Sequence, residues 1–91
     1  MRFPGSFWTK IHGGAYQQSG LPDLIGCVEG VFFGIEVKMP GKEDTLTKLQ
    51  NHTLEQIIEA GGLALVATDP KKTADTVGRM LGYEEAHYEN R

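Results

Sequence analysis

The chain has 91 residues, a formal net charge of −3 and one cysteine. A chain of this length forms one domain, which we expect to span residues 1–83, followed by a polar tail at 84–91. One cysteine excludes an internal disulfide and a zinc site made of several thiolates. The acidic balance argues against a protein that coats nucleic acid by bulk charge, although nine Lys and Arg residues can supply a local basic rim.

The sequence shows no signal for a membrane or for export. No apolar segment approaches the ~20 residues of a membrane span, and the N-terminus lacks a signal-peptide pattern. We therefore expect a cytoplasmic protein. Because a domain of this size buries only about 60–65% of the surface of its unfolded chain, pairing with a second copy would help to stabilise it.

The first part of the chain predicts three strands. Aromatic and β-branched residues at 7–12 favour a strand. The apolar segments 23–28 and 31–38 are typical of paired strands, and Glu29-Gly30 between them is typical of a tight hairpin turn. We therefore expect an antiparallel hairpin preceded by one further strand.

The second part predicts a helix, a strand and a helix. We expect the first helix to be capped by Asp44 or Thr45 and to end near Ala60, with an apolar stripe formed by Leu46, Leu49, Leu54, Ile57 and Ile58. Residues 63–67 suit a buried strand. The last helix, capped by Asp69, should run from 70 to about 81, with core residues Ala74, Val77, Met80 and Leu81. This order predicts a small α/β domain with a mixed sheet.

The hairpin predicts which side chains meet across its strands. If Glu29-Gly30 is a two-residue loop, Asp23 faces Glu36, and alternation puts Lys38 on the same face. Carboxylates directly opposite each other have Cβ atoms about 4.5–5.5 Å apart and repel each other. A bound Mg²⁺ or Mn²⁺ would neutralise them, because hard cations take carboxylate oxygens. The sequence therefore predicts a metal site at one end of the hairpin.

A plainer interpretation stands beside this one. Glu-Val-Lys is also a common pattern on a solvated strand face, and a glutamine at a helix edge is often just hydrogen-bonded locally. The opposed Asp23 and the Pro22 before it favour the site. Gln50 lies on the apolar side of its helix, where an unpaired polar group costs roughly 1–3 kcal/mol. We therefore expect Gln50 to reach Lys38 or the attacked phosphate.

Three motifs carry a family resemblance: Gly20-Leu21-Pro22-Asp23, Gly34-Ile35-Glu36-Val37-Lys38, and Gln50 in the following helix. Together they resemble the PD-(D/E)XK nuclease superfamily and, within it, the virus-type replication-repair nuclease (VRR-NUC) domain, over about residues 8–68. The resemblance implies a restriction-endonuclease-like core. It also implies a stand-alone, phage-like form working in a bacterial or phage-infected cell.

The resemblance further implies a DNA endonuclease that uses Mg²⁺ or Mn²⁺ and no small-molecule cofactor. The expected substrate is branched DNA such as four-way junctions, and the expected assembly is a homodimer. Asp23 and Glu36 match the family's metal-binding acids, and the carbonyl of Val37 would lie by the metal. Lys38 matches the catalytic lysine, and Gln50 matches the helix glutamine.

Candidate DNA contacts follow from position alone. Lys10 and His12 share one face of the first strand, and Lys42 and Lys48 flank the start of the first predicted helix. Taken singly, each is as readily a solvated surface residue. The family usually carries a further acid on a helix ahead of the first strand, whereas no Asp or Glu precedes Asp23 here. The alternative is therefore a weak or inactive nuclease-fold module for DNA binding or assembly.

Overall fold

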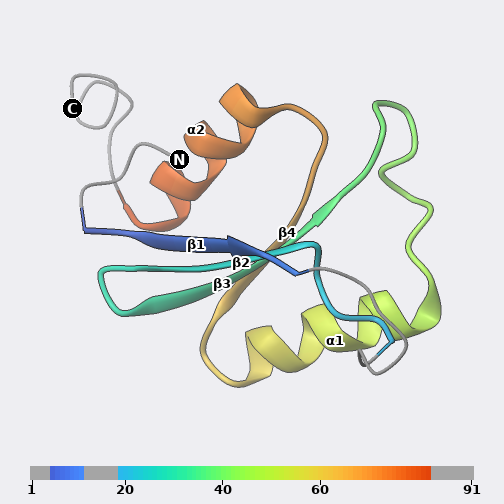
Figure 1. Ribbon diagram of the computed structural model, residues 1–91, viewed down its shortest axis with the longest axis horizontal. Helices are drawn as coiled ribbons and strands as arrows, with labels where there is room; N and C mark the ends of the chain where they lie inside the picture. Colours follow the sequence, from blue (N-terminus) through green and yellow to red (C-terminus); the bar gives the residue numbers. More distant parts are fainter. Residues whose placement is uncertain (1–4, 12–18, 83–91) are drawn as a thin grey trace.

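The described part of the chain forms a four-stranded mixed sheet with two helices (Figure 1). The computed structural model describes residues 5–11 and 19–82. Its elements are β1 (Phe7–Lys10), β2 (Leu24–Val28), β3 (Val31–Val37), α1 (Lys48–Glu59), β4 (Leu63–Ala67) and α2 (Pro70–Met80). The predicted small α/β domain with a mixed sheet is confirmed. None of the helices in the described ranges is long and apolar enough to span a membrane.

The β2–β3 hairpin has the predicted register. The ladder ends with Leu24 opposite Ile35, so that Asp23, one residue before β2, lies opposite Glu36. The turn residues Glu29-Gly30 have φ values of 52° and 80°. Positive φ at both positions is the geometry that suits a two-residue hairpin turn.

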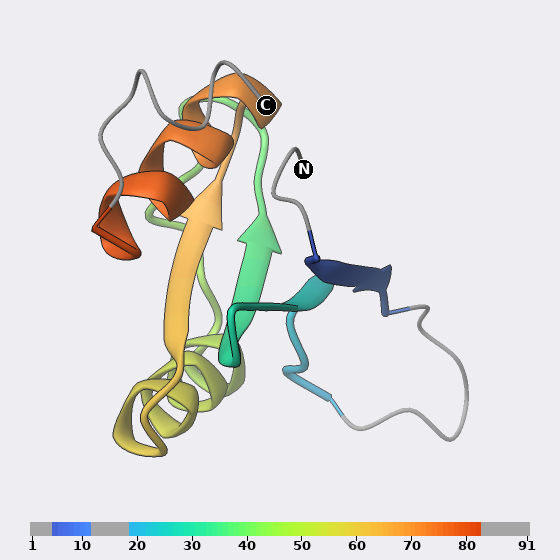
Figure 2. The same ribbon diagram turned by 90° about the vertical axis from the view of Figure 1, so that its left-hand side faces the viewer.

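The sheet brings the ends of β3 and β4 to one edge. The strand order is β1-β2-β3-β4, in which β2 is antiparallel to β1 and to β3, and β4 is parallel to β3. α1 is the crossover that makes the parallel pairing possible. Figure 2 shows β3 and β4 side by side, pointing the same way, with β4 leading into α2 at that edge.

The two faces of β3 are covered by different helices. Phe33 is fully buried and forms a core with Val77 of α2. The next residue, Gly34, faces α1, because a Cβ added there would lie 2.5 Å from Cδ1 of Ile57. Glu36 shares the face of Gly34 and is only 3% exposed. A carboxylate therefore lies between the sheet and α1.

The predicted start of α1 is wrong. Thr47 is the N-cap, and Thr47 and Gln50 form a reciprocal capping box. Asp44 and Thr45 do not cap the helix, because the chain turns sharply after β3. The hydroxyl of Thr45 donates to the carbonyl of Lys42 at 2.6 Å instead of accepting from a helical N–H.

The apolar pattern of the helices also predicted too wide a buried stripe. Leu54 is buried in α1, but Leu46 precedes the helix, and Leu49 and Ile58 are 56% and 55% exposed. In α2, Met80 is 39% exposed rather than part of the core. Fewer apolar positions than predicted are therefore buried in the two helices.

The start of α2 and the end of α1 follow the predicted chemistry. Oδ1 of Asp69 accepts from the backbone N–H groups of Lys71 and Lys72, and proline opens α2. Gly61, after α1, has a φ of 93°, which suits a helix C-terminus. The predicted extension of the first strand is wrong at Ile11, because β1 ends at Lys10. Residue 12 and the predicted tail at 84–91 lie outside the described residues.

Candidate functional site

Asp23 is fixed where three strands meet. Its Oδ2 accepts a hydrogen bond of 2.9 Å from the backbone N–H of Val37. Its carbonyl accepts one of 2.8 Å from the N–H of Ile11, just beyond β1. Pro22 before it is buried, while the Asp23 residue is exposed. The loop into β2 therefore holds this carboxylate at the sheet end with access to solvent.

Glu36 is the buried partner of this carboxylate. Its Oε1 accepts from Nε2 of Gln50 at 3.3 Å, while Oε2 is buried without a hydrogen-bonding partner. The pKa of Glu36 is raised from 4.5 to about 7. Burial is the main cause, followed by the neighbouring Asp23 carboxyl group, which shares the proton of neutral Glu36 and repels its charged form, and the charge of Lys38 partly offsets these effects. The Glu36 carboxyl group is therefore only partly ionised near pH 7 when nothing else is bound.

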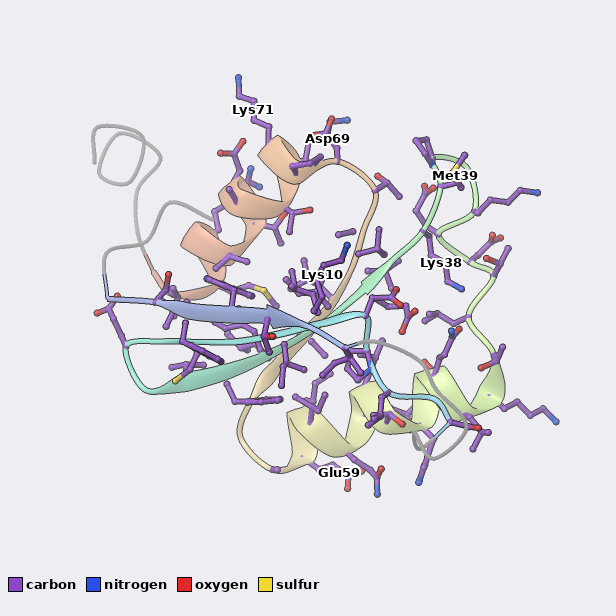
Figure 3. All side chains as sticks on the ribbon, viewed as in Figure 1. Lys10, Lys38, Met39, Glu59, Asp69 and Lys71 are labelled. Carbon is purple, nitrogen blue, oxygen red and sulfur yellow. The ribbon has the colours of Figure 1, made fainter. Side chains whose placement is uncertain are left out.

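Gln50 connects the acids to Lys38. Its Oε1 accepts from Nζ of Lys38 at 3.2 Å and from the backbone N–H of Thr47 at 2.9 Å. Its Nε2 donates to Glu36. Figure 3 shows Lys38 between the end of β3 and the start of α1. The predicted contact between Gln50 and Lys38 is confirmed, and the same glutamine also binds the buried acid.

A divalent cation suits the donors at this site. The buried Oε2 of Glu36 has no partner, and the Asp23 carboxylate lies beside it. A hard cation takes such oxygens and keeps several waters. No three His, Cys, Asp or Glu side chains converge within residues 5–11 and 19–82. The protein would therefore supply two carboxylates and, as the resemblance predicts, the Val37 carbonyl.

The predicted DNA contacts lie around this cluster as far as the structure describes them. Lys10 pairs with Leu24 at the end of β1 and is exposed. Lys42, in the loop after β3, and Lys48, the first residue of α1, are also exposed. His12 lies outside the described residues.

Thr47 is a site-supporting residue that the sequence interpretation missed. It caps α1 and thereby fixes the residue that holds both Lys38 and Glu36. The signal was present as Thr-x-x-Gln, the spacing of a capping box. Asp44 and Thr45, a few positions earlier, are also suitable cap residues and were predicted instead.

A hollow lies across the sheet from Asp23 and Glu36. It has a volume of about 580 Å³ and lies between the end of β3 and α2, with walls that include Val37, Ala67, Pro70 and Ala74. Its lining is mainly apolar, and neither Asp23 nor Glu36 lines it. We therefore place any acid–base or metal chemistry at the carboxylate cluster and not in this hollow.

The cluster as a whole combines a cation-binding acid pair with a fixed ammonium group. Comparisons of the chain with protein-family models, with curated proteins and with solved structures found no match. What the site does must therefore be inferred from its own chemistry. Two acids can hold a cation, and an adjacent lysine can stabilise negative charge on a reacting group. This combination suits the transfer or hydrolysis of a phosphate ester.

Proposed function

We propose that the chain is a divalent-metal-dependent DNA endonuclease with a restriction-endonuclease-like core. One observation carries the proposal: Asp23, Glu36 and Lys38 converge at the end of one hairpin, and Gln50 hydrogen-bonds to two of them. A buried carboxylate with an unpartnered oxygen lowers stability, so packing alone does not explain why Glu36 occupies this position. The VRR-NUC resemblance of the same residues supports the proposal.

Each side chain has a distinct part in the proposed reaction. Asp23 and Glu36, with the Val37 carbonyl, hold Mg²⁺ or Mn²⁺. When bound, such a cation polarises the scissile phosphate and makes a water molecule more acidic. Lys38 stabilises the negative charge that develops on the phosphate oxygens. Gln50 keeps Lys38 and Glu36 at a fixed separation through its two hydrogen bonds.

Replacement of Lys38 tests the proposal directly. We expect Lys38→Ala to lower Mn²⁺-dependent nicking of a supercoiled plasmid by at least about 10²-fold, because a preorganised positive charge is lost. Folding, followed by circular dichroism, should be retained. Arg79→Ala, at the far end of α2, is the matched control and should nick at the wild-type rate. Nicking by Lys38→Ala at that same rate would show that the proposal is wrong.

A non-catalytic DNA-binding or assembly module is the second candidate. The observation that favours it is the acid count: no third Asp or Glu joins the pair among the described residues. Such a module would bind duplex DNA without cutting it in Mn²⁺. Its binding would also be the same with and without metal and in Asp23→Ala. The nuclease instead requires cleavage that disappears with Asp23→Ala.

Branched DNA and a homodimer belong to the same proposal. Two copies related by a twofold axis present two centres to two strands, as resolution of a four-way junction needs. A panel of labelled duplex, flap and junction substrates tests the preference. The solution mass, measured by light scattering, tests the dimer. Equal cleavage of all three substrates by a monomer would contradict both parts.

A further inference from the structure

All six lysines of the sequence lie at one end of the molecule. Each lysine lies at the end of β1, at or after the end of β3, or at the start of a helix: Lys10, Lys38, Lys42, Lys48, Lys71 and Lys72. β3 and β4 are parallel and finish at the same edge, so both helices start near that edge, on opposite sides of the sheet. Arg79 lies at the opposite end of α2. The lysines therefore gather at the end of the molecule that holds the candidate site, together with the acids Asp23, Glu36, Glu43, Asp44 and Asp69.

Lys71 and Lys72 belong to this end although the sequence interpretation assigned them no role. Ala67, the last residue of β4, accepts a hydrogen bond of 2.8 Å from the backbone N–H of Lys38. The chain then turns through Asp69 into α2, where Lys71 and Lys72 are both exposed. Figure 3 shows Lys71 projecting outward from the start of α2. The two lysines therefore continue the rim of the site on the α2 side.

Both of these lysines are exposed at the start of α2. Asp69 uses Oδ1 to accept from the backbone N–H groups of Lys71 and Lys72, and Asp75 lies one turn further along the same helix. The start of α2 adds the positive end of a helix dipole.

The separation of the lysines indicates what they would hold together. Lys48 is the first residue of α1 on one side of the sheet, and Lys71 is the second residue of α2 on the other. Packed layers lie about 10 Å apart, so the two helix starts are on the order of 20 Å apart. A single phosphate group cannot bridge this span. A nucleic-acid duplex can, because it presents phosphates on both sides of its grooves.

We infer that Lys71 and Lys72 bind backbone phosphates of a DNA duplex that lies across the ends of β3 and β4, opposite the contact made by Lys48. The inference rests on the proposed function in one respect only, namely which backbone phosphate of the duplex lies at Asp23 and Glu36. It extends the expected contact surface from the α1 side of the sheet to both sides. A phosphate-binding lysine orients the substrate without reading its sequence.

The salt dependence of duplex binding tests this inference without cleavage. Affinity of the full chain for a labelled duplex oligonucleotide is measured in EDTA at several salt concentrations. Each phosphate contact contributes about 0.9 to the slope of log K against log salt. Lys71→Gln and Lys72→Gln should each lower the slope by about that amount. Arg79→Gln makes the same charge change on the same helix and should leave the slope unchanged.

Every outcome bears on the inference. Slopes for Lys71→Gln and Lys72→Gln equal to that of Arg79→Gln overturn it, as does a wild-type chain that binds no duplex. Equal affinity for polyglutamate overturns the assignment to nucleic acid. If the duplex is cut while the slopes stay unchanged, the inference fails and the nuclease proposal stands. If the slopes fall but no DNA is cut in Mn²⁺, the contacts stand and the nuclease proposal fails.

Discussion

Glu36 occupies a position where an apolar side chain would pack more easily. It is 3% exposed between β3 and α1, and only Oε1 has a hydrogen-bonding partner. Burial and the neighbouring Asp23 raise its pKa from 4.5 to about 7. Below the pKa of Glu36 in the unfolded chain, the folded and unfolded chains both bind the proton. Above its pKa in the folded chain, both release it. The stabilising effect of the proton is therefore full below pH 4.5 and is lost as the pH rises to about 7.

Glu36→Gln should remove this pH dependence. In EDTA, the free energy of unfolding of the wild-type chain should fall, relative to the variant, by up to about 3 kcal/mol as the pH rises from 4.5 to above 7. Urea unfolding at several pH values measures the difference. Glu59→Gln, an exposed substitution at the end of α1, should follow the wild-type curve. A constant difference between wild type and Glu36→Gln would contradict the raised pKa.

Residue pairing at the site was predictable, but burial was not. Counting from the Glu29-Gly30 turn correctly placed Asp23 opposite Glu36, because a hairpin of known loop length has only one register. Strand alternation also placed Lys38 on the face that Gln50 meets. It does not reveal how closely a helix covers that face. The raised pKa of Glu36 therefore appears only once α1 is in place.

At the scale of elements, the start of α1 is also part of the site. The carbonyl oxygen of the Gln50 side chain serves both the Thr47 backbone and Lys38. Helix capping and lysine positioning therefore depend on the same atom. The sequence contained the capping-box spacing, but Asp44 and Thr45 offered equally good caps. Only the turn in which Lys42 and Thr45 hydrogen-bond decides between them.

Thr47→Ala should affect cleavage through Gln50 as well as stability. Loss of an N-cap hydroxyl typically costs about 1 kcal/mol of unfolding free energy. Because Gln50 then loses one of its two anchors on the helix, we expect a fall in kcat at unchanged KM under conditions where the variant is fully folded. Thr47→Ser keeps the hydroxyl and should restore both quantities. A stability loss with wild-type kcat would show that the capping box acts on the helix alone.

The contact between β1 and β2 depends on a glycine. A Cβ added to Gly26 would lie 2.2 Å from Cε3 of Trp8, whose ring also lies 5.7 Å from that of Phe33. We expect Gly26→Ala to lower the free energy of unfolding by about 1–3 kcal/mol, because the rigid indole must move. Tryptophan fluorescence and urea unfolding measure this. Gly34→Ala, whose Cβ would lie 2.5 Å from the flexible end of Ile57 and 3.1 Å from Cγ of Pro22, should cost less. A reversed order would contradict this packing.

At the scale of the whole molecule, the lysines are distributed unevenly. The net charge of −3 argues against bulk attraction to nucleic acid, whereas all six lysines lie at the end where β3 and β4 finish and both helices start. The composition gives only the net charge, whereas the topology determines where the charged residues lie in space. The parallel pairing of β3 with β4 is what brings Lys71 and Lys72 to the edge that holds Lys38. A crossover placed elsewhere would have separated them.

Cation binding should therefore stabilise the whole fold. The folded chain holds the Asp23 and Glu36 carboxylates together, whereas the unfolded chain does not. A ligand that binds only the folded state at 100 times its Kd adds about 2.7 kcal/mol. For a domain of this size, each 1 kcal/mol raises Tm by roughly 4–8 °C. Mn²⁺ should thus raise the wild-type Tm clearly, and by more above pH 7, where no proton must leave Glu36.

Two variants make this prediction specific to the site. Asp23→Asn and Glu36→Gln each remove one carboxylate and should lose most of the Mn²⁺-dependent rise in Tm. Glu59→Gln, which removes an exposed carboxylate at the other end of α1, should keep it. Scanning calorimetry at pH 6 and pH 8, with Mn²⁺ or with EDTA, measures all four proteins. An equal rise in the wild type and in both site variants would mean that the cation binds elsewhere, because the acid pair is the only place where both variants act.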